Sequence, residues 1–290
     1  CARYHGEPDE RSFVAIGAIS PCGHRCISMT PVLVFDIETI PDVPGLRRLH
    51  GIDATLSDSE VAEMAFQQRR AQNGSDFLQH HLQRIVVISC ALRAGKDLRV
   101  FSLCEPELSE GEIVQRFFDG IEKFTPQLVS WNGGGFDLPV LHYRGLIHGV
   151  TAPRYWDLGD GDYADSRDFK WNNYISRYHT RHLDLMDLMA LYQPRANAPL
   201  DDLAKLAGFP GKLGMDGGKV WDGWQAGEIT GIRDYCETDV MNTYLVSLRF
   251  RLMRGELSRA DYTQEIEFVR GELARLDKPH WHEFLAAWPL

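Results

Sequence analysis

The sequence predicts an α/β fold built around one mixed sheet. Segments with strand character gather in the first half of the 290-residue chain, helical patterns dominate the second half, and the two kinds alternate in between. Hydrophobic residues make up 44% of the chain, which is enough to bury a substantial core. We find no internal repeat or low-complexity tract that would indicate another architecture.

Four strands are expected in the first half. Residues 32–38 form an apolar run that ends in polar residues, as a buried strand does. Residues 84–92 and 98–103 are two further strands, and the short turn with Gly95 between them predicts a hairpin. Residues 127–131 are again apolar and precede a run of glycines.

Helical patterns lie between and after these strands. Residues 57–83 are charged and rich in glutamine at helical spacing, which indicates an inserted helical arm. Ser109 and Glu112 have the spacing of a capping box at the start of an amphipathic helix over residues 109–124. Further along we expect a loop at 151–180, a short strand at 178–183, helices at 184–192 and 199–207, a glycine-rich loop at 211–227, and helices at 228–255 and 263–276.

The first 30 residues look separate from the rest. They show no sustained period of 2 or 3.6 residues, and Met29 stands just before the first strand. We therefore expect residues 1–30 to be a disordered or non-native extension, with the native start at Met29. Residues 31–290 would then form one domain that carries the inserted arm and the C-terminal helices.

Charge and composition limit the classes of function. The net charge is −10, and this argues against a protein that coats duplex nucleic acid, because such a protein needs a basic face. It allows an enzyme that grips one strand end through metal ions, since the cations neutralise both the acidic site and the phosphate. No apolar run reaches the ~18 residues of a membrane span. Together with scattered cysteines of the reduced type, this predicts a cytoplasmic protein without membrane contact.

The first chemical motif lies at the end of the first strand. Asp36 and Glu38 are two residues apart, so on a strand they point to the same face and could share one ion. Acids within an apolar pattern are unfavourable unless they are paired or bind a metal. The alternative is a polar strand end that faces solvent.

The second motif follows another buried strand. Residues 132–137 read Asn-Gly-Gly-Gly-Phe-Asp, and the glycines permit positive φ and close approach of a ligand to the backbone. Asp137 would lie at or near a helix N-terminus. The alternative is an ordinary N-cap aspartate after a flexible turn.

The third motif lies on a late helix. Tyr235 and Asp239 are four residues apart and therefore share one helix face. Asp239 could bind a metal while Tyr235 contacts the water on that metal. The alternative is a core tyrosine beside a solvated aspartate.

The order and combination of the three motifs resemble the DEDD exonucleases of the ribonuclease H-like superfamily. The likeness extends over about residues 31–250 and is greatest to proteins related to the 3′→5′ exonuclease domain of family B DNA polymerases. Tyr235, where other members have histidine, indicates the tyrosine subtype. The resemblance implies a mixed five-stranded sheet flanked by helices, with the site at the edge of the sheet.

The resemblance also implies roles for the motif residues. Two divalent ions, Mg²⁺ or Mn²⁺, would be held by four carboxylates, and hard ions of this kind prefer oxygen ligands. Asp36 would bridge both ions, Glu38 and Asp239 would complete the shell of one, and Asp137 would support the other. Tyr235 would orient the attacking water.

We expect further residues to contact the strand end. Arg181 belongs to a segment in which basic and aromatic residues alternate, a mixture that can meet phosphates and stack bases. An ordinary surface loop is the alternative for this segment. The residues expected to bind substrate are Ile37, Thr39, Asn132, Gly133, Phe136 and Arg181.

The predicted function is hydrolysis of single-stranded nucleic acid from its 3′ end, with DNA favoured and nucleoside 5′-monophosphates released. An exoribonuclease similar to RNase D is the alternative within the same class. A non-catalytic nucleic-acid-binding module of the same fold is the alternative of another class, although such a module would be expected to lack one of the carboxylates. A homo-oligomer or a protein partner, docked through the arm or the C-terminal helices, is compatible with each.

Overall fold

The computed structural model describes residues 30–215 and 217–289. The extension expected at residues 1–30 therefore lies, apart from Thr30, outside the described residues. Five strands form one sheet in the order β3-β2-β1-β4-β5. The strands are β1 (Val32–Pro41), β2 (Gln83–Ala94), β3 (Asp97–Cys104), β4 (Gln127–Ser130) and β5 (His182–Asp184).

The sheet is mixed, as predicted. The central strand β1 runs antiparallel to β2 and parallel to β4, while β2 and β3 form the expected hairpin and β4 and β5 are parallel. Strand β1 is nearly continuously apolar because the sheet is covered on both faces. Leu33, Phe35 and Ile37 join one core cluster, and Val32 and Val34 join another.

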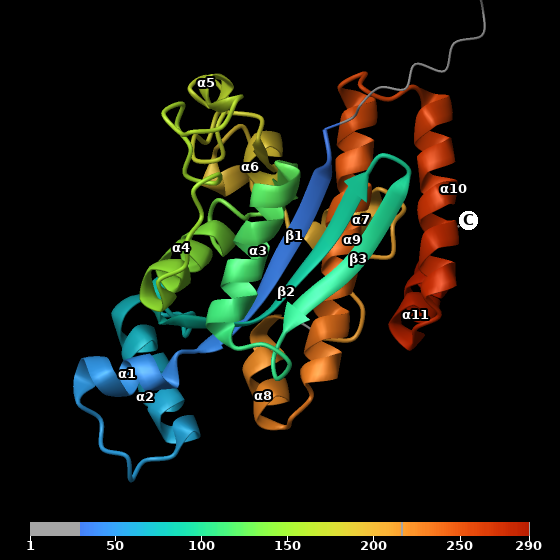
Figure 1. The fold of residues 1–290 in the computed structure, drawn as a ribbon. Coiled ribbons are helices and arrows are strands. Elements are labelled where there is room, and N and C mark those ends of the chain that lie inside the picture. The colour runs from blue at the N-terminus through green and yellow to red at the C-terminus, as the bar shows by residue number, and fades with distance from the viewer. Residues whose placement is uncertain (1–29, 216, 290) are drawn as a thin grey trace, which may run out of the picture.

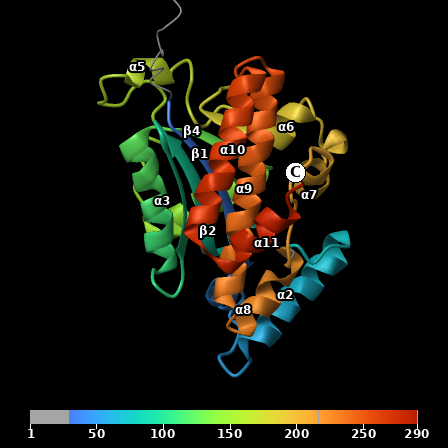
Figure 2. The same ribbon diagram turned by 90° about the vertical axis from the view of Figure 1, so that its right-hand side faces the viewer.

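Helices cover both faces of the sheet (Figure 1). Helices α3 (Glu110–Phe124) and α4 (Asp137–His148) pack on one face, and the long helix α9 (Ile229–Met253) packs on the other. Helices α10 (Arg259–Leu276) and α11 (Pro279–Ala287) lie outside α9, as the turned view shows (Figure 2). Helix α9 is therefore enclosed between the sheet and a second helical layer.

Local sequence signals explain where several helices begin. Ser109 and Glu112 form the predicted capping box of α3, in which each satisfies a backbone N–H of the other. Pro44 lies in the first turn of α1 (Val43–His50), where its missing N–H is harmless. The predicted arm is helical in α2 (Asp58–Asn73) and continues to the short 3₁₀ turn η1 (His80–Leu82).

Some expected elements differ. The glycine-rich loop predicted at 211–227 contains η3 (Gly217–Lys219) and helix α8 (Val220–Gln225), which Val220 anchors in the core. Helix α11 was not predicted; it begins at a proline and is rich in aromatic side chains that pack on α9. The remaining short elements are α5 (Ser166–Phe169), α6 (Leu185–Met189), η2 (Pro194–Ala196) and α7 (Leu200–Leu206).

None of the helices within the described residues has the length and apolar character that crossing a membrane requires.

Candidate active site

Two carboxylates lie side by side on the central strand. Asp36 and Glu38 lie near the middle of β1, and strand alternation turns both toward α9. The register of β1 against β2 shifts directly after Glu38, which bends the strand there. Ligand atoms of Asp36, Glu38 and the thiol of Cys236 on α9 all lie within 4.8 Å of one another.

Asp137 joins these carboxylates from another element. The pairing of β1 with β4 ends before Ile37, so the backbone N–H of Ile37 has no partner on β4. It donates instead to Asp137 Oδ1 at 3.1 Å. Asp137 is the first residue of α4 and is buried. Burial raises the pKa of this carboxyl to about 7, although the backbone N–H donors of Asp137 and Ile37 oppose the rise.

A buried ion-pair network fixes helix α4 and hence Asp137. Arg144, two turns along α4, donates from Nε to Glu110 Oε1 at 2.6 Å and from Nη1 to Asp42 Oδ2 at 2.6 Å. Glu110 begins α3 and Asp42 precedes α1, so three helices are tied to one guanidinium. Because all three side chains are buried, the network restrains α4 relative to the strand that carries Asp36.

Helix α9 contributes the fourth carboxylate and the phenol. Asp239 and Tyr235 share the α9 face that packs on β1, as their spacing predicts, and both are buried. Asp239 Oδ2 lies 2.9 Å from Lys212 Nζ, and the same amine donates to the Tyr235 hydroxyl. Asp239 Oδ1 has no hydrogen-bond partner among the described residues.

The carboxylates raise one another's pKa. Burial is the main cause of the raised pKa of Asp36 and Glu38, followed by the charges of neighbouring carboxylates. Burial likewise raises the pKa of Asp239, while Lys212 opposes it. Tyr235 has its pKa raised by burial and then by Asp239, so the phenol keeps its proton.

Lys212 is a site residue that sequence reasoning missed. Its loop between α7 and α8 is fixed by Asn242 on α9, which donates to Gly211 O at 2.8 Å and accepts from Gly211 N at 3.1 Å. The backbone N–H of Lys212 also donates to Asp201 Oδ1 at 2.7 Å. These three bonds bring the amine to the carboxylates, and no periodic pattern in the sequence indicates this placement.

The glycine loop is also held by a residue that the sequence analysis did not single out. Asp184 caps α6, and it additionally accepts from Asn132 N at 3.0 Å and Gly134 N at 2.8 Å. Gly133 has no room for a side chain, because an added Cβ would lie 2.2 Å from Ser130 Oγ. The glycines therefore allow the tight turn that leads to Asp137.

The substrate-binding residues predicted from sequence have different positions. Ile37 and Thr39 flank Glu38 on β1, and Thr39 Oγ1 donates to Gln83 at 3.0 Å. Phe136 packs between Phe77, at a ring distance of 5.3 Å, and His80, at 5.7 Å, so it serves the packing of the loop.

Arg181 is not brought to the site. It lies next to the beginning of β5, and its backbone carbonyl bonds to the beginning of β4, whereas the carboxylates follow the other end of these strands. Its guanidinium lies 3.6 Å from the Phe169 ring centroid and donates to Asn172 O at 2.6 Å. Arg181 thus holds its own loop together, and its position does not support a contact with the strand end.

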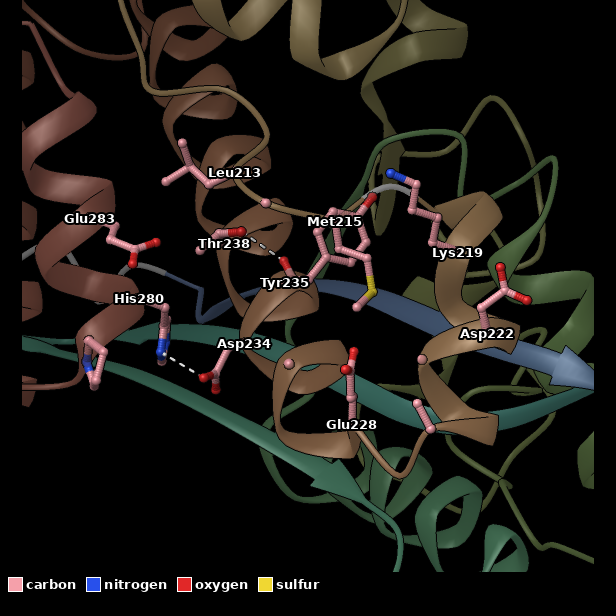
Figure 3. Close-up of a pocket in the computed structure, with 15 residues that line it drawn as sticks. Leu213, Met215, Lys219, Asp222, Glu228, Asp234, Tyr235, Thr238, His280 and Glu283 are labelled. Carbon is pink, nitrogen blue, oxygen red and sulfur yellow. Dashed lines mark hydrogen bonds and ion pairs between the residues drawn. The ribbon is translucent and has the colours of Figure 1, made fainter.

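The site lies on the face of the central strand β1 on which α9 packs, beside the turn that follows β4. A cavity of about 650 Å³ adjoins Tyr235 and Thr238, but none of the four carboxylates lines it (Figure 3). Leu213 and Met215, which follow Lys212 in the chain, form part of its wall.

The donor set fits hard divalent cations. Asp36, Glu38, Asp137 and Asp239 offer carboxylate oxygens, which Mg²⁺ and Mn²⁺ prefer. Asp239 Oδ1 has no partner among the described residues, and burial with mutual repulsion raises the pKa of Asp36 and Glu38, so a bound cation would stabilise the cluster. The amine of Lys212 supplies part of the positive charge.

Comparison with known protein families finds one match. Residues 75–288 match a family described as predicted 3′–5′ exonucleases related to the exonuclease domain of PolB. The matched segment contains Asp137, Lys212, Tyr235 and Asp239 and begins after β1. No curated protein matches the chain.

A solved structure, the family B DNA polymerase of the hyperthermophilic archaeon Pyrobaculum calidifontis, aligns at 20% sequence identity with a TM-score of 0.49. The alignment covers 78% of this chain and 25% of the polymerase, so the chain spans about a quarter of that protein's length. Because the family match extends over residues 75–288, well over half of the chain, this protein belongs to the family of predicted 3′–5′ exonucleases related to the exonuclease domain of PolB.

Proposed function

We propose that this chain removes nucleoside 5′-monophosphates from the 3′ end of single-stranded nucleic acid, with DNA preferred over RNA. In this proposal it is a DEDD exonuclease of the tyrosine subtype with a ribonuclease H-like fold. The observation that supports it best is the meeting of four carboxylates from β1, α4 and α9, three of them buried and Asp36 half-buried, with the amine of Lys212 beside Asp239. Such a cluster is unfavourable unless it binds cations.

Asp36, Glu38, Asp137 and Asp239 would hold two divalent ions, Mg²⁺ or Mn²⁺. When bound, two such ions supply a hydroxide near neutral pH and stabilise the charge that develops on the phosphate. Asp36 is the residue best suited to bridge them, because Asp137 bonds to the N–H of the next residue, Ile37, and Asp239 lies on the α9 face that packs on β1.

Two side chains of the protein would act directly on the reactants. Tyr235 retains its proton, so its hydroxyl orients the attacking water by hydrogen bonding and does not act as a base. Lys212, whose amine contacts both Tyr235 and Asp239, is placed to hold a phosphate oxygen once the carboxylates are otherwise neutralised.

Residues around the carboxylates would position the strand end. Thr39 offers a hydroxyl one residue beyond Glu38, and the backbone of Ile37 lies between the two carboxylates of β1. Asn132 and Gly133 begin the turn that leads to Asp137, where close approach of a sugar or phosphate is sterically allowed. Phe136 would support this turn by packing.

The proposal is tested by a time course on 5′-labelled single-stranded DNA and RNA of one sequence, with Mg²⁺, Mn²⁺ or EDTA. A metal-dependent ladder that shortens from the 3′ end is expected, faster on DNA, and absent for Asp36→Asn. Faster cleavage of RNA than of DNA would indicate that the protein is an exoribonuclease. A folded protein that binds the strands but cleaves neither with any metal would identify a binding module instead.

A further inference from the structure

An apolar groove of about 520 Å³ lies between α6, α7 and the C-terminal end of α9 (Figure 2). Its lining is mostly aliphatic or aromatic and includes Leu203, Phe250 and Met253. Met253 is 65% exposed, and Met189, which lines the groove from α6, is 46% exposed. Large apolar side chains that gather in one hollow and remain exposed indicate a surface that another molecule covers.

The charged groups of this groove are positive. Of the described residues that line it, Arg249 and Arg259 are charged, and none carries a carboxylate. Arg249 donates at 3.1 Å to a tyrosine hydroxyl and at 3.1 Å to a backbone carbonyl, which are neutral acceptors. Arg259 is exposed and forms no ion pair within the described part of the chain. Glu256 lies nearby in the sequence but is already paired with Arg254 at 3.0 Å. The groove therefore combines apolar side chains with positive charge that no carboxylate neutralises, in a chain whose net charge is −10.

The walls of the groove limit how a partner can bind. They are helices, whose backbone groups bond within the helix, so no strand edge is available for pairing with a partner strand. A site for a small ligand would enclose roughly 70–90% of the ligand surface, whereas this groove is open to solvent along Met253. An amphipathic helix suits such a groove, because it buries its apolar face and leaves its polar face in water. The flexible methionines Met189 and Met253 can adapt to its side chains.

A second copy of this chain fits the groove poorly. In a two-fold dimer the same surface of both copies meets, so the guanidiniums of Arg249 and Arg259 would face like charges. Carboxylates on a different protein would instead complement them. The charge of the groove thus favours an acidic partner.

We propose that this groove docks an amphipathic helical segment of another protein, with apolar side chains on one face and carboxylates beside them that pair with Arg249 and Arg259. The inference goes beyond the proposed nuclease activity and uses none of the residues of the candidate active site. Met253 and Asp239 are separated by about 20 Å along α9, at about 1.5 Å per residue. A docked partner would therefore leave the four carboxylates accessible.

The test uses the full chain and three fluorescently labelled peptides of about 15 residues, a length that allows a helix to form. The first peptide has leucines at positions i, i+3, i+4 and i+7 and glutamates at the flanking positions. The second has lysines in place of the glutamates, and the third has the composition of the first with the leucines distributed around the helix. Fluorescence anisotropy should show that the first peptide binds at least about tenfold tighter than either control, because it alone has both the apolar face and the complementary charge.

Charge reversal on the protein identifies the binding surface. Arg259→Glu should weaken binding of the glutamate peptide about 3- to 10-fold and strengthen binding of the lysine peptide, because attraction is replaced by repulsion. Arg259 is in the first turn of α10, where a glutamate is favourable, so this variant should fold. Arg116→Glu, the same change at an exposed position of α3, should leave both affinities unchanged.

The apolar contact is tested separately. Met253→Asp should weaken binding of the glutamate peptide at least about tenfold, because it removes an apolar contact and adds a charge of the same sign as the peptide. Met253 is exposed, so the change should leave the core intact. Melting curves of each variant verify that it is folded.

Equal affinity for the three peptides would overturn the proposal, as would no binding of the glutamate peptide or an affinity that Arg259→Glu and Met253→Asp leave unchanged. Sedimentation of the chain alone should show a monomer. A dimer that Met253→Asp dissociates would assign the groove to a second copy and would also overturn the proposal. Because no nucleic acid is present in these experiments, their outcome is independent of whether the chain is an exonuclease.

Discussion

Two buried carboxylates on helix α9 differ in nearly every respect except their burial. Asp239 and Glu237 are two residues apart, so they point to different faces of the helix. Glu237 accepts from Ser102 at 3.0 Å, lies 3.2 Å from Lys278 Nζ, and faces His280 Nε2 at 2.9 Å. Asp239 has one amine on Oδ2 and no hydrogen-bond partner among the described residues on Oδ1.

Their pKa values move in opposite directions. Burial tends to raise the pKa of Glu237, but His280, Lys278 and Ser102 together outweigh it and lower the pKa. Burial dominates for Asp239, and its pKa is raised. The same contrast holds between Glu265, whose pKa is lowered chiefly by Arg93, and Asp36 on β1.

The comparison separates buried carboxylates whose charge the protein itself neutralises from those that we propose bind metal ions. Asp234, Glu237 and His280 also lie close enough to hold a metal, but Lys278 and Arg233 already neutralise the two carboxylates. Around Asp36, Glu38 and Asp239 the only such cation within the described part of the chain is Lys212. The balance of partners, rather than burial, therefore distinguishes the proposed metal-binding carboxylates from the structural ones.

The largest effect is expected from neutralising one proposed metal-binding carboxylate, Asp36, and one structural carboxylate, Glu237. Asp36→Asn should reduce kcat at least about 100-fold, as removal of one stabilising group in a catalytic site does. The metal-free variant should melt no lower than the wild-type protein, because the change relieves charge repulsion. Glu237→Gln should do the reverse and destabilise the fold by about 1–3 kcal/mol while activity per folded molecule is retained.

Steady-state kinetics and melting curves of the two variants verify this pair of outcomes. If Glu237→Gln lost activity without losing stability, the division between structural and functional carboxylates would be wrong.

The next effect concerns the groups that contact the reactants rather than the ions. Tyr235→Phe and Lys212→Met should each reduce kcat about 10- to 100-fold, since the first removes a hydrogen bond to the attacking water and the second a donor to the phosphate. The Mn²⁺ concentration for half-maximal rate should not rise in Lys212→Met, because a competing cation is removed. A titration with Mn²⁺ in both variants measures this concentration. A higher value for Lys212→Met than for the wild-type protein would contradict the role that we assign to Lys212.

Particular residues show how far sequence could lead to this site. Asp36 with Glu38 and Tyr235 with Asp239 were visible because strand and helix periods place each pair on one face. Lys212 was not visible, because Asn242 and Asp201 fix its loop through tertiary bonds. Arg181 was misplaced because basic and aromatic composition does not show at which end of a strand a side chain lies.

The strands of the sheet could also be predicted from the sequence pattern, whereas helix α8 could not. Continuous apolar runs predicted the strands of a sheet covered on both faces, and Gly95 predicted the hairpin. Helix α8 is short and lies in a glycine-rich segment, so local propensity argued against it, and packing of Val220 in the core stabilises it.

Metal should stabilise the protein by an amount that depends on pH. The pKa values of Asp36, Glu38 and Asp137 are raised on folding, that of Asp137 to about 7. Their protonated forms therefore stabilise the metal-free fold at low pH, and this contribution is lost as pH rises through the folded pKa values. Divalent ions bind the ionised forms, so they should restore more stability at pH 8 than at pH 5.5.

Melting curves in EDTA and in saturating Mn²⁺ between pH 5.5 and 8.5 measure this dependence. We expect the shift in Tm to grow with pH and to reach about 5–10 °C, given about 2–3 kcal/mol for an ion well above its Kd. In Asp36→Asn, the metal-induced shift in Tm should vary less with pH. A shift in the wild-type protein that shrinks as pH rises would contradict the prediction.

The smallest effect is expected at Glu265, on the structural side of the comparison. This carboxylate of α10 pairs with Arg93 of β2 at 2.7 Å and accepts from the Tyr244 hydroxyl of α9 at 2.8 Å. Its lowered pKa means that the ion pair stabilises the fold above pH of about 4.5, the ordinary value, and that this contribution is lost as pH falls through the folded pKa. Glu265→Gln should therefore lower stability by about 1–2 kcal/mol at pH 7. Urea unfolding of both proteins should show the difference shrinking below pH of about 4.5, with cleavage of DNA unchanged, because the carboxylate that already has its partners takes no part in the reaction.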